Sequence, residues 1–431
     1  MLEISAPKGV RDILPGEYWK WDYVLGVFGK TAVDFGYSGI HLPVFEHTEL
    51  FSRGIGDGTD VVDKEMYTFN DKGGRSITLR PEATASMVRA YLENRMASLQ
   101  QPVKLWCAGP MFRYERPQKG RFRQFWQVDF ESLGSPSPLA DVETITLALE
   151  AFRRLGLSNL EVVINSVGCP VCRPGYIEKL TGFFASRAED LCGTCQDRLS
   201  KNPLRILDCK RESCRKISEE APSGLESLCG ECEAHFVSVR ESLDNLGAAY
   251  HIDKKLVRGL DYYTKTAYEI LSGALGAQNA ICGGGRYDNL AEVIGGPSLP
   301  AVGFAAGMDR IVMVMEDQGC SFGEEPGLDV FATAFDGPPR ASILILTDQL
   351  RREGISADMD FGERSMKAQM KTASARGARL VCILGENELA ADTVAVKNMA
   401  SGEQVEIPRD TAPAAIKRMI AELRGRETRP L

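Results

Sequence analysis

The sequence lacks long hydrophobic runs, since nowhere among its 431 residues do about 18 apolar residues follow one another. We therefore expect no membrane-spanning helix and no membrane partner. The first residues, MLEISAPKGVRD, reach charged side chains before the apolar core of a signal peptide could form, so we expect a cytoplasmic protein. Internal repeats and low-complexity tracts are also lacking, and 44% hydrophobic with 26% charged residues is typical of an ordinary globular protein.

The chain also lacks an excess of positive charge. It carries 51 Lys and Arg against 59 Asp and Glu, a net charge of −8, which excludes a globally basic nucleic-acid binder. A local binding surface remains open, because phosphate binding requires clustered cations and not a basic average. The densest cluster is Arg113 to Arg123, RYERPQKGRFR, and a solvated charged hairpin is the alternative interpretation of this segment.

The length predicts two or three domains, at roughly 150 residues per domain. Two alternating apolar runs within residues 103–134 predict a pair of antiparallel strands joined by a charged loop. After a Ser-, Gly- and Pro-containing break at 321–327, strand and helix patterns alternate, which indicates an α/β domain. We therefore divide the chain into a core of residues 1–168 and 236–322, a Cys-rich insertion of residues 169–235, and an α/β domain of residues 327–431.

Cysteines are concentrated in the insertion, which holds eight of the twelve. Thiols of a cytoplasmic protein should be reduced, so the clustering favours metal over disulfides. Three pairs have C-x₂-C spacing and one has C-x₄-C, and four pairs could supply two Cys₄ zinc sites. The spacing leaves open which pairs combine; reduced thiols from an ancestral site, or partial disulfides, are the alternatives. The pairs are Cys169 with Cys172, Cys192 with Cys195, Cys209 with Cys214, and Cys229 with Cys232.

The insertion has few apolar runs, so we expect it to have little hydrophobic core. Bound Zn²⁺ would then supply much of its folding free energy, in a structural role remote from the chemistry. His235 could replace one thiolate, although a surface position on the following helix is the other interpretation.

Three arginine-centred segments outside the insertion suggest chemistry. On a strand, Arg113 and Glu115 share a face, where they could hold a phosphate and an adenine amino group; a cross-strand salt bridge is the alternative. In GMDR (307–310), the arginine could stack on a base. The third segment combines LVRGLDYY (256–263) with CGGGRYD (282–288), which is not a Walker loop because no Gly-Lys-Ser/Thr follows. Its three glycines could also form a strand-edge bulge without a function.

Together these segments resemble the histidyl-tRNA synthetase family, which belongs to the class II aminoacyl-tRNA synthetases, over essentially the whole chain. FRYERPQKGRFRQFWQVDFE resembles the second class motif, PAVGFAAGMDR the third, and PVFEHTELFSRGIGDGTDVVDKEMYTF with TLRPEATASMVRA the first motif and the amino-acid loop. LVRGLDYY and GGGRYD are similar to two segments peculiar to the family. The chain departs at Ala83, where the family often has Gly, and Asp129 lies at a variable position to which we assign no role.

The resemblance implies an α+β catalytic domain with an antiparallel sheet, a C-terminal α/β anticodon-binding domain and a homodimer with the region around Pro43 at its interface. It implies formation of histidyl-adenylate from ATP and L-histidine, with Mg²⁺ on the outer phosphates, and transfer to tRNA(His). Arg258 and Arg113 would be the catalytic residues. The ATP residues would be Arg113, Glu115, Phe125 and Arg310. The histidine residues would be Glu82, Thr84, Arg113, Gln127, Glu131, Arg258, Tyr262 and Tyr263. The residues near the tRNA acceptor end would be Arg116, Gln118, Lys119 and Arg121.

Two other interpretations stand beside this one. A non-catalytic histidine-sensing regulatory paralogue of histidine biosynthesis would resemble the core but lack the anticodon domain and lose active-site charges, whereas this chain keeps Arg113, Glu115, Arg258 and Arg310. A plain metal-binding scaffold would leave those arginines unexplained. Individual residues also have simpler interpretations, since Glu82 after Pro81 could be an ordinary first-turn helix acid.

Overall fold

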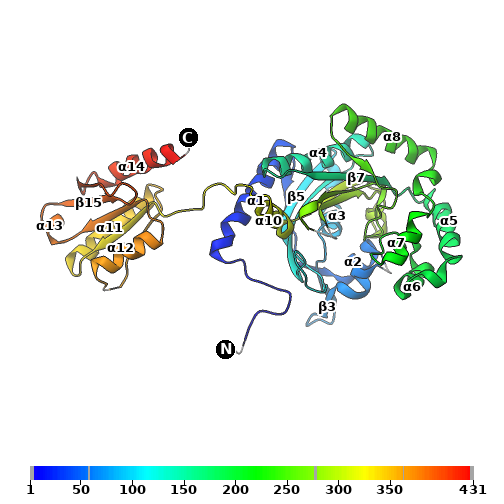
Figure 1. The fold of residues 1–431 in the computed structure, drawn as a ribbon, viewed down its shortest axis with the longest axis horizontal. Helices are drawn as coiled ribbons and strands as arrows, with labels where there is room; N and C mark the ends of the chain where they lie inside the picture. The colour runs from blue at the N-terminus through cyan, green and yellow to red at the C-terminus, as the bar shows by residue number, and fades with distance from the viewer. Residues whose placement is uncertain (1–3, 57–58, 276–278, 363, 428–431) are drawn as a thin grey trace. The chain divides into compact units, whose positions relative to one another are not determined.

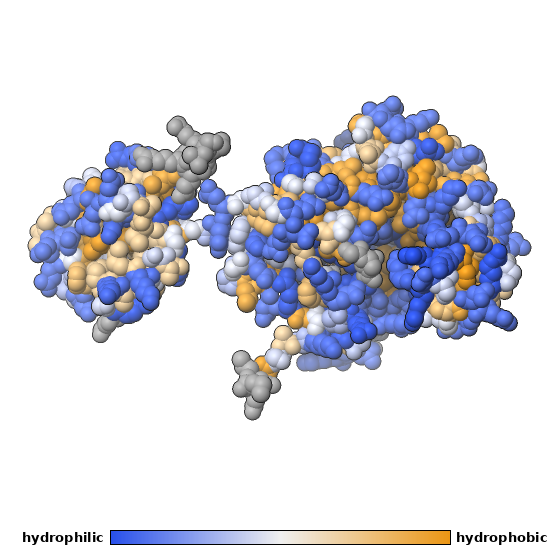
Figure 2. All heavy atoms as spheres, in the orientation of Figure 1, coloured by the Kyte–Doolittle hydropathy of each residue, from blue (hydrophilic) through white to orange (hydrophobic). Residues whose placement is uncertain are grey.

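An eight-stranded sheet and a five-stranded sheet organise the described chain, and a three-stranded sheet accompanies the first (Figure 1). The computed structural model describes residues 4–56, 59–275, 279–362 and 364–427. It divides into two units, unit 1 from Met1 to Gly323 and unit 2 from Glu324 to Leu431. Hydrophilic residues cover most of the visible surface of each unit (Figure 2). Within the described residues, no helix combines the length and the apolar character needed to cross a membrane.

Unit 1 is built on an eight-stranded sheet with the strand order β1-β5-β6-β11-β10-β9-β7-β8. Neighbouring strands are antiparallel except at the two edges, where β1 pairs with β5 and β7 with β8 in parallel. The expected α+β class with an antiparallel sheet is confirmed. The strands are β1 (Ser38–Gly39), β5 (Val103–Phe112), β6 (Gln124–Leu133), β7 (Leu160–Ser166), β8 (His251–Ile252), β9 (Thr264–Ser272), β10 (Ala280–Arg286) and β11 (Ala301–Gly307).

One face of this sheet carries the main hydrophobic core. Four helices cover it, α1 (Pro15–Asp34), α4 (Pro138–Arg154), α8 (Gly230–Asn245) and α10 (Met308–Asp317). At its centre Phe130 of β6 stacks between Phe304 and Trp106, with ring centroids 5.0 and 5.8 Å away. Because side chains alternate along a strand, the neighbours of Phe130 on β6 point to the opposite face of the sheet.

The opposite face is only partly covered. Met87 and Tyr91 of α3 (Thr84–Glu93) pack there against Leu105 and Cys107 of β5. Two further helices, α2 (Thr48–Ile55) and α9 (Leu290–Val293), and a small sheet of β2 (Phe45–His47), β4 (Ser76–Leu79) and β3 (Tyr67–Asn70) complete this side. The polar side chains of β6 face the space that these elements leave open.

A buried ionic cluster connects the sheet with α4 and α8. Arg286, at the end of β10, is fully buried and pairs with Asp141, which shares a 3.1 Å hydrogen bond with Nε2 of His235. Burial by itself would raise the pKa of Asp141, but His235 and Arg286 outweigh it and hold that pKa below its usual value. His235 is therefore neither a thiolate substitute nor a surface residue. The three glycines do not lie at a strand edge, because β10 is inside the sheet, although its pairing with β9 shifts register between Gly285 and Arg286.

The insertion consists of helices and has a core of its own. Its helices are α5 (Arg173–Ala185), α6 (Gly193–Lys201) and α7 (Glu212–Glu219), which form a group at one end of unit 1 (Figure 1). Leu180, Phe184 and Ile206 are fully buried together with the thiols of Cys195 and Cys214. The expectation of little core is wrong because these apolar residues are dispersed along short helices and form no long run in the sequence.

Unit 2 has the α/β organisation expected from the sequence. Its sheet has the order β13-β12-β14-β15-β16, with β12 parallel to both neighbours and the remaining pairs antiparallel. The strands are β12 (Val330–Ala334), β13 (Ala357–Met359), β14 (Leu380–Leu384), β15 (Thr393–Asn398) and β16 (Gln404–Pro408). The helices are α11 (Pro338–Arg352), α12 (Met366–Ala375), α13 (Glu386–Ala390) and α14 (Ala412–Glu427).

Candidate active site

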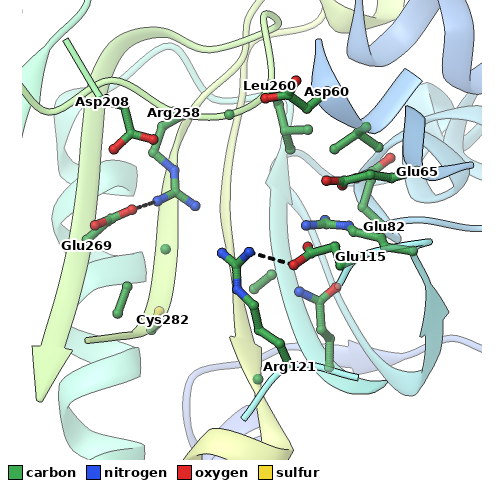
Figure 3. Close-up of a pocket in the computed structure, with 18 of the residues that line it drawn as sticks. Asp60, Glu65, Glu82, Glu115, Arg121, Asp208, Arg258, Leu260, Glu269 and Cys282 are labelled. Carbon is green, nitrogen blue, oxygen red and sulfur yellow. Dashed lines mark hydrogen bonds and ion pairs between the residues drawn. The ribbon is translucent and has the colours of Figure 1, made fainter. Parts of the chain in front are cut away.

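A cavity of about 600 Å³ lies on the partly covered face of the large sheet (Figure 3). Gln127, Asp129 and Glu131 of β6 face it, and their partners across the β6–β11 ladder are Gly307, Ala305 and Gly303. These small partners keep the cavity open. A Cβ atom on Gly303 would overlap the carboxylate of Glu131, and one on Gly283 of β10 would overlap the guanidinium of Arg258.

The residues predicted for histidine and ATP gather in this cavity. Those that line it are Glu82, Thr84, Arg113, Glu115, Phe125, Gln127, Glu131, Arg258, Tyr262, Tyr263 and Arg310. Of the four predicted near the tRNA acceptor end, Arg121 also lines the cavity, whereas Arg116, Gln118 and Lys119 are exposed on the β5–β6 hairpin.

The cavity contains a buried carboxylate surrounded by hydroxyl groups. Glu131 accepts a 2.7 Å hydrogen bond from Oγ1 of Thr84 and another from the hydroxyl of Tyr287. Burial raises the pKa of Glu131 well above its usual range. The rings of Tyr262 and Tyr263, with centroids 4.8 Å apart, lie beside it. The sequence interpretation gave Tyr287 no role, although it directly follows Arg286 in GGGRYD.

Glu82 has a structural role at the start of α3. Its carboxylate accepts hydrogen bonds from the backbone N–H groups of Thr84 at 2.7 Å and Ala85 at 3.0 Å, so the helix begins at Thr84 and not near Pro81. Glu82 also lines the cavity, and burial raises its pKa despite these hydrogen bonds. The first-turn interpretation is wrong, because Glu82 precedes the helix and binds its first N–H groups from outside.

Asp129 is the most unusual group in the cavity. It is fully buried, and neither carboxylate oxygen has a hydrogen-bond partner among the residues that the structure describes. Burial, reinforced by the nearby carboxylate of Glu82, raises the pKa of Asp129 to about 8. The amide oxygen of Gln127, two residues earlier on the same face, is likewise buried without a partner in the described chain.

Arginines from several elements also line the cavity. Arg258 forms an ion pair with Glu269, and Arg121 pairs with Glu115 at 2.6 Å (Figure 3). Nε of Arg113 donates to the carbonyl of Pro81 at 2.9 Å, and Nη1 of Arg310 to that of Ala280 at 2.6 Å.

The pKa values of two of these arginines are shifted in opposite directions by their surroundings. Burial, followed by repulsion from Arg121, lowers the pKa of Arg310. Burial also acts against the charge of Arg258, but the carboxylate of Glu269 outweighs it and raises the pKa above its usual value. Because arginine keeps its proton in proteins, these guanidinium groups attract polyanions to the cavity.

The insertion contributes one wall of the cavity. Its contact with the core centres on Asp60, which accepts from Arg198 and Arg205 at 2.9 Å each, and Asn202 donates to Asp261 at 2.9 Å. The insertion residues that line the cavity are Cys192, Thr194, Arg198, Arg205, Asp208, Cys209, Lys210 and Arg211. The expectation that the cysteines lie remote from the chemistry is therefore wrong for this part of the insertion.

The eight cysteines form two groups of four thiols. Cys169 and Cys172 meet Cys229 and Cys232, and the second group, Cys192, Cys195, Cys209 and Cys214, combines the two middle pairs. Sγ of Cys169 lies 3.8 Å from Sγ of Cys172 and of Cys229, and Sγ of Cys192 lies 3.9 Å from that of Cys209. Zn–S bonds of about 2.3 Å place the sulfur atoms of a tetrahedral site about 3.8 Å apart, so the thiols fit such an ion. They are not disulfide-bonded.

Comparisons with known proteins agree with this geometry. A family model described as Histidyl-tRNA synthetase matches residues 9–170 and 209–311, and one described as Anticodon binding domain matches residues 341–419. The gap in the first match falls within the insertion. The chain is 50% identical over 413 residues to a histidine–tRNA ligase of Acetivibrio thermocellus, which covers 96% of this chain and 99% of that protein. The corresponding ligase of Pelotomaculum thermopropionicum is 52% identical over 406 residues, 94% of this chain and 96% of that protein.

Among solved structures, that of the apo histidyl-tRNA synthetase of S. aureus superimposes with a TM-score of 0.82 at 37% identity. The match covers 96% of this chain and 100% of that chain.

The raised pKa of Asp129 predicts a pH-dependent cost of this residue to stability. Asp129 has a pKa of about 8 in the folded protein and about 4 in the unfolded chain, so the free energy of unfolding decreases as pH rises between these values. Asp129→Asn should therefore melt higher than the wild type, by about 2–5 °C near pH 8, and by progressively less toward pH 5. Thermal unfolding between pH 5.5 and 8.5 measures this difference. A constant or opposite difference across that range would show that the carboxyl group is not held neutral by burial.

Proposed function

The chain belongs to the histidyl-tRNA synthetase family and is a histidine–tRNA ligase, and we propose that the cavity of unit 1 is where it forms histidyl-adenylate from ATP and L-histidine. One observation carries this assignment. A buried carboxylate with tyrosine and threonine hydroxyls lines the same cavity as the guanidinium groups of Arg113, Arg258 and Arg310. The buried carboxylate and its hydroxyls suit an imidazole ring and the guanidinium groups suit phosphates, so the carboxylate of histidine and the α-phosphate of ATP would meet between these two sets of residues.

Adenylate formation needs alignment and charge neutralisation but no general base. The carboxylate of histidine is already ionised and attacks the α-phosphorus directly. Arg113 would hold the α-phosphate, and Arg258 would bind the histidine carboxylate and the charge that develops beside it. Arg258 can do so while paired with Glu269, because a guanidinium has five N–H donors and its Nε lacks a partner among the described residues.

The remaining ATP contacts follow from other residues that line the cavity. Phe125 and Arg310 would stack on the adenine, and Glu115 would accept from its amino group after separating from Arg121. Mg²⁺ would neutralise the outer phosphates of ATP. The carboxylate of Glu269 lines the cavity and would offer this ion a hard oxygen ligand.

Histidine would be selected by the buried carboxylate and its hydroxyls. Glu131 and Tyr263 would bracket the two ring nitrogens, with Tyr287 and Thr84 orienting Glu131, while Glu82, Thr84 and Gln127 would receive the α-ammonium group. An apolar side chain of the same size would leave these buried groups unpaired and would therefore be rejected strongly.

The direct test of the assignment is amino-acid-dependent exchange of pyrophosphate into ATP, measured with each of the twenty amino acids. Exchange with histidine alone is the expected result. A histidine-sensing regulatory protein would bind histidine but would exchange with no amino acid. The retained arginines and the match to an anticodon-binding domain over residues 341–419 favour the ligase over that alternative.

Replacing Arg258 should impair the chemical step. Because its guanidinium would act on charge that appears in the transition state, Arg258→Ala should lower the rate of histidine-dependent exchange by about 10²–10³-fold. Arg153→Ala is the matched control, since this exposed arginine pairs with Glu150 on α4 and should leave exchange unchanged. Near-normal exchange by the Arg258 variant would remove this residue from the mechanism.

Transfer to tRNA would use both units. We assign anticodon binding to unit 2 and approach to the acceptor end to the β5–β6 hairpin, where Arg116 and Lys119 are exposed beside the cavity. Replacing both by Ala should weaken aminoacylation of tRNA and flatten its dependence on salt, because fewer counterions are released from phosphates. Pyrophosphate exchange should remain intact. A double variant of the exposed Lys30 and Arg153 is the charge-matched control, and equal losses in both assays would assign the hairpin to ATP instead.

We propose that each of the two clusters of four cysteines binds one structural Zn²⁺. Elemental analysis of protein purified with reductant and without chelator should then find about two zinc ions per chain, one for each four-thiol group. Cys209→Ser should lose about one ion and lower exchange, because Cys209 belongs to the cavity wall. Cys382→Ser, which changes a buried thiol of unit 2, is the control that should lose none. Less than about half an ion per wild-type chain would reject the proposal.

We further propose that the protein is a cytoplasmic homodimer with the region around Pro43 in its interface. The exposed apolar side chains of Val44 and Phe45, next to Pro43, support this assignment. Sedimentation of the wild-type protein and of a Phe45→Glu variant tests it: a dimer should become a monomer.

A further inference from the structure

Asp129 occupies a position that the assigned roles leave unexplained. It lies on β6 between Gln127 and Glu131, on the face that lines the cavity. A fully buried carboxyl group without a hydrogen bond is costly, and such a group is normally retained only where a ligand completes its contacts. Asn or Ser would avoid the cost of a buried charge at this position.

The cations near Asp129 do not pair with it. Arg80 donates through Nε to the carbonyl of Pro110 at 3.0 Å and through Nη1 to that of Leu42 at 3.2 Å, and Arg113 donates to Pro81. Within the described residues, neither arginine forms an ion pair with Asp129. Its partners across the ladders are Cys107 and Ala305, which are too small or too apolar to serve. The cavity that Asp129 lines is the remaining place from which a partner can come.

Nearby acceptors indicate which kind of ligand this is. The amide oxygen of Gln127 is also buried and unpartnered in the described chain, and the carboxylate of Glu82 lines the same floor. A primary ammonium group has three N–H donors and no acceptor, so it needs three acceptors around it. Glu82, Gln127 and Asp129 supply acceptors of this kind, and the oxygens of Gln127 and Asp129 have no hydrogen-bond partner among the described residues.

We propose that Asp129 binds the α-ammonium group of histidine and is the charged acceptor that anchors it. This inference rests on the proposed function and adds a binding residue to it. Glu82 is already engaged by two backbone N–H groups of α3, so Asp129 supplies the acceptor capacity that Glu82 lacks. The carboxyl group ionises as the ammonium group arrives, because the neighbouring positive charge favours its charged form. Asp129 is a binding residue and takes no part in the attack on phosphorus.

Two histidine analogues separate this role from a contact with the imidazole ring or a general effect on folding. Histidinol retains the ring and the ammonium group, whereas imidazole-4-propionate retains the ring and the carboxylate but has no ammonium group. Calorimetric titration of the full-length wild type and Asp129→Asn with each compound should show affinity for histidinol reduced about 10- to 100-fold. Affinity for imidazole-4-propionate should stay within about twofold, because that ligand offers Asp129 no cation.

The kinetic counterpart is a higher KM for histidine with the KM for ATP nearly unchanged. An equal loss of affinity for both analogues would overturn the proposal and assign Asp129 to the ring or to folding. Unchanged affinity for histidinol would overturn it as well. Titration needs no ATP, so its outcome is independent of pyrophosphate exchange by the wild type, which tests the proposed function separately.

Discussion

The open cavity depends on glycines in two central strands, β10 and β11, because a glycine has no side chain to fill the space. Gly303 of β11 lies directly across from Glu131 of β6, and Gly283 of β10 lies under the guanidinium of Arg258, so a methyl group at either position would overlap a charged side chain. Alternation along β6 assigns Phe130 to the aromatic core on one face and Asp129 and Glu131 to the cavity on the other. The rigid packed face holds the polar face in register, and the glycines leave space for a ligand above it.

Connections far from the cavity maintain the same arrangement. Arg286 follows the glycines on β10, and its pairing with Asp141, which also binds His235, fixes the end of that strand to α4 and α8. Arg173, next to Cys172, donates to the backbone carbonyl of Tyr263 and so connects the first thiol group with the tyrosines beside Glu131. Asp60 holds the insertion against the core through Arg198 and Arg205. The polar residues of the cavity are therefore supported from the sheet, the helices and the insertion.

The sequence predicts those features that depend on local pattern. Alternation predicted β5 and β6, and the family motifs predicted the antiparallel class. Unit 2 begins at Glu324, within the composition break at 321–327. The sequence pattern did not predict the tertiary contacts. The spacing left the cysteine pairs uncombined because Cys169 and Cys229 meet only through the fold. The sequence around His235 did not indicate its hydrogen bond with Asp141. The burial of Asp129 depends on β11, a strand that follows it by more than a hundred residues.

The first cluster of four cysteines joins the two ends of the insertion. Cys169 and Cys172 stand where the chain leaves the core, Cys229 and Cys232 stand where it returns, and sulfur atoms of the two ends lie 3.8 Å apart. The intervening helices thus form a closed loop with a narrow neck. Because the entropy of closing a loop grows only slowly with its length, residues could be gained or lost inside the neck at small cost to the sheet. Inside the neck, only segments that carry neither the second four-cysteine cluster nor the cavity wall can change length in this way, because those residues and the ones that dock against Asp60 are held by their contacts.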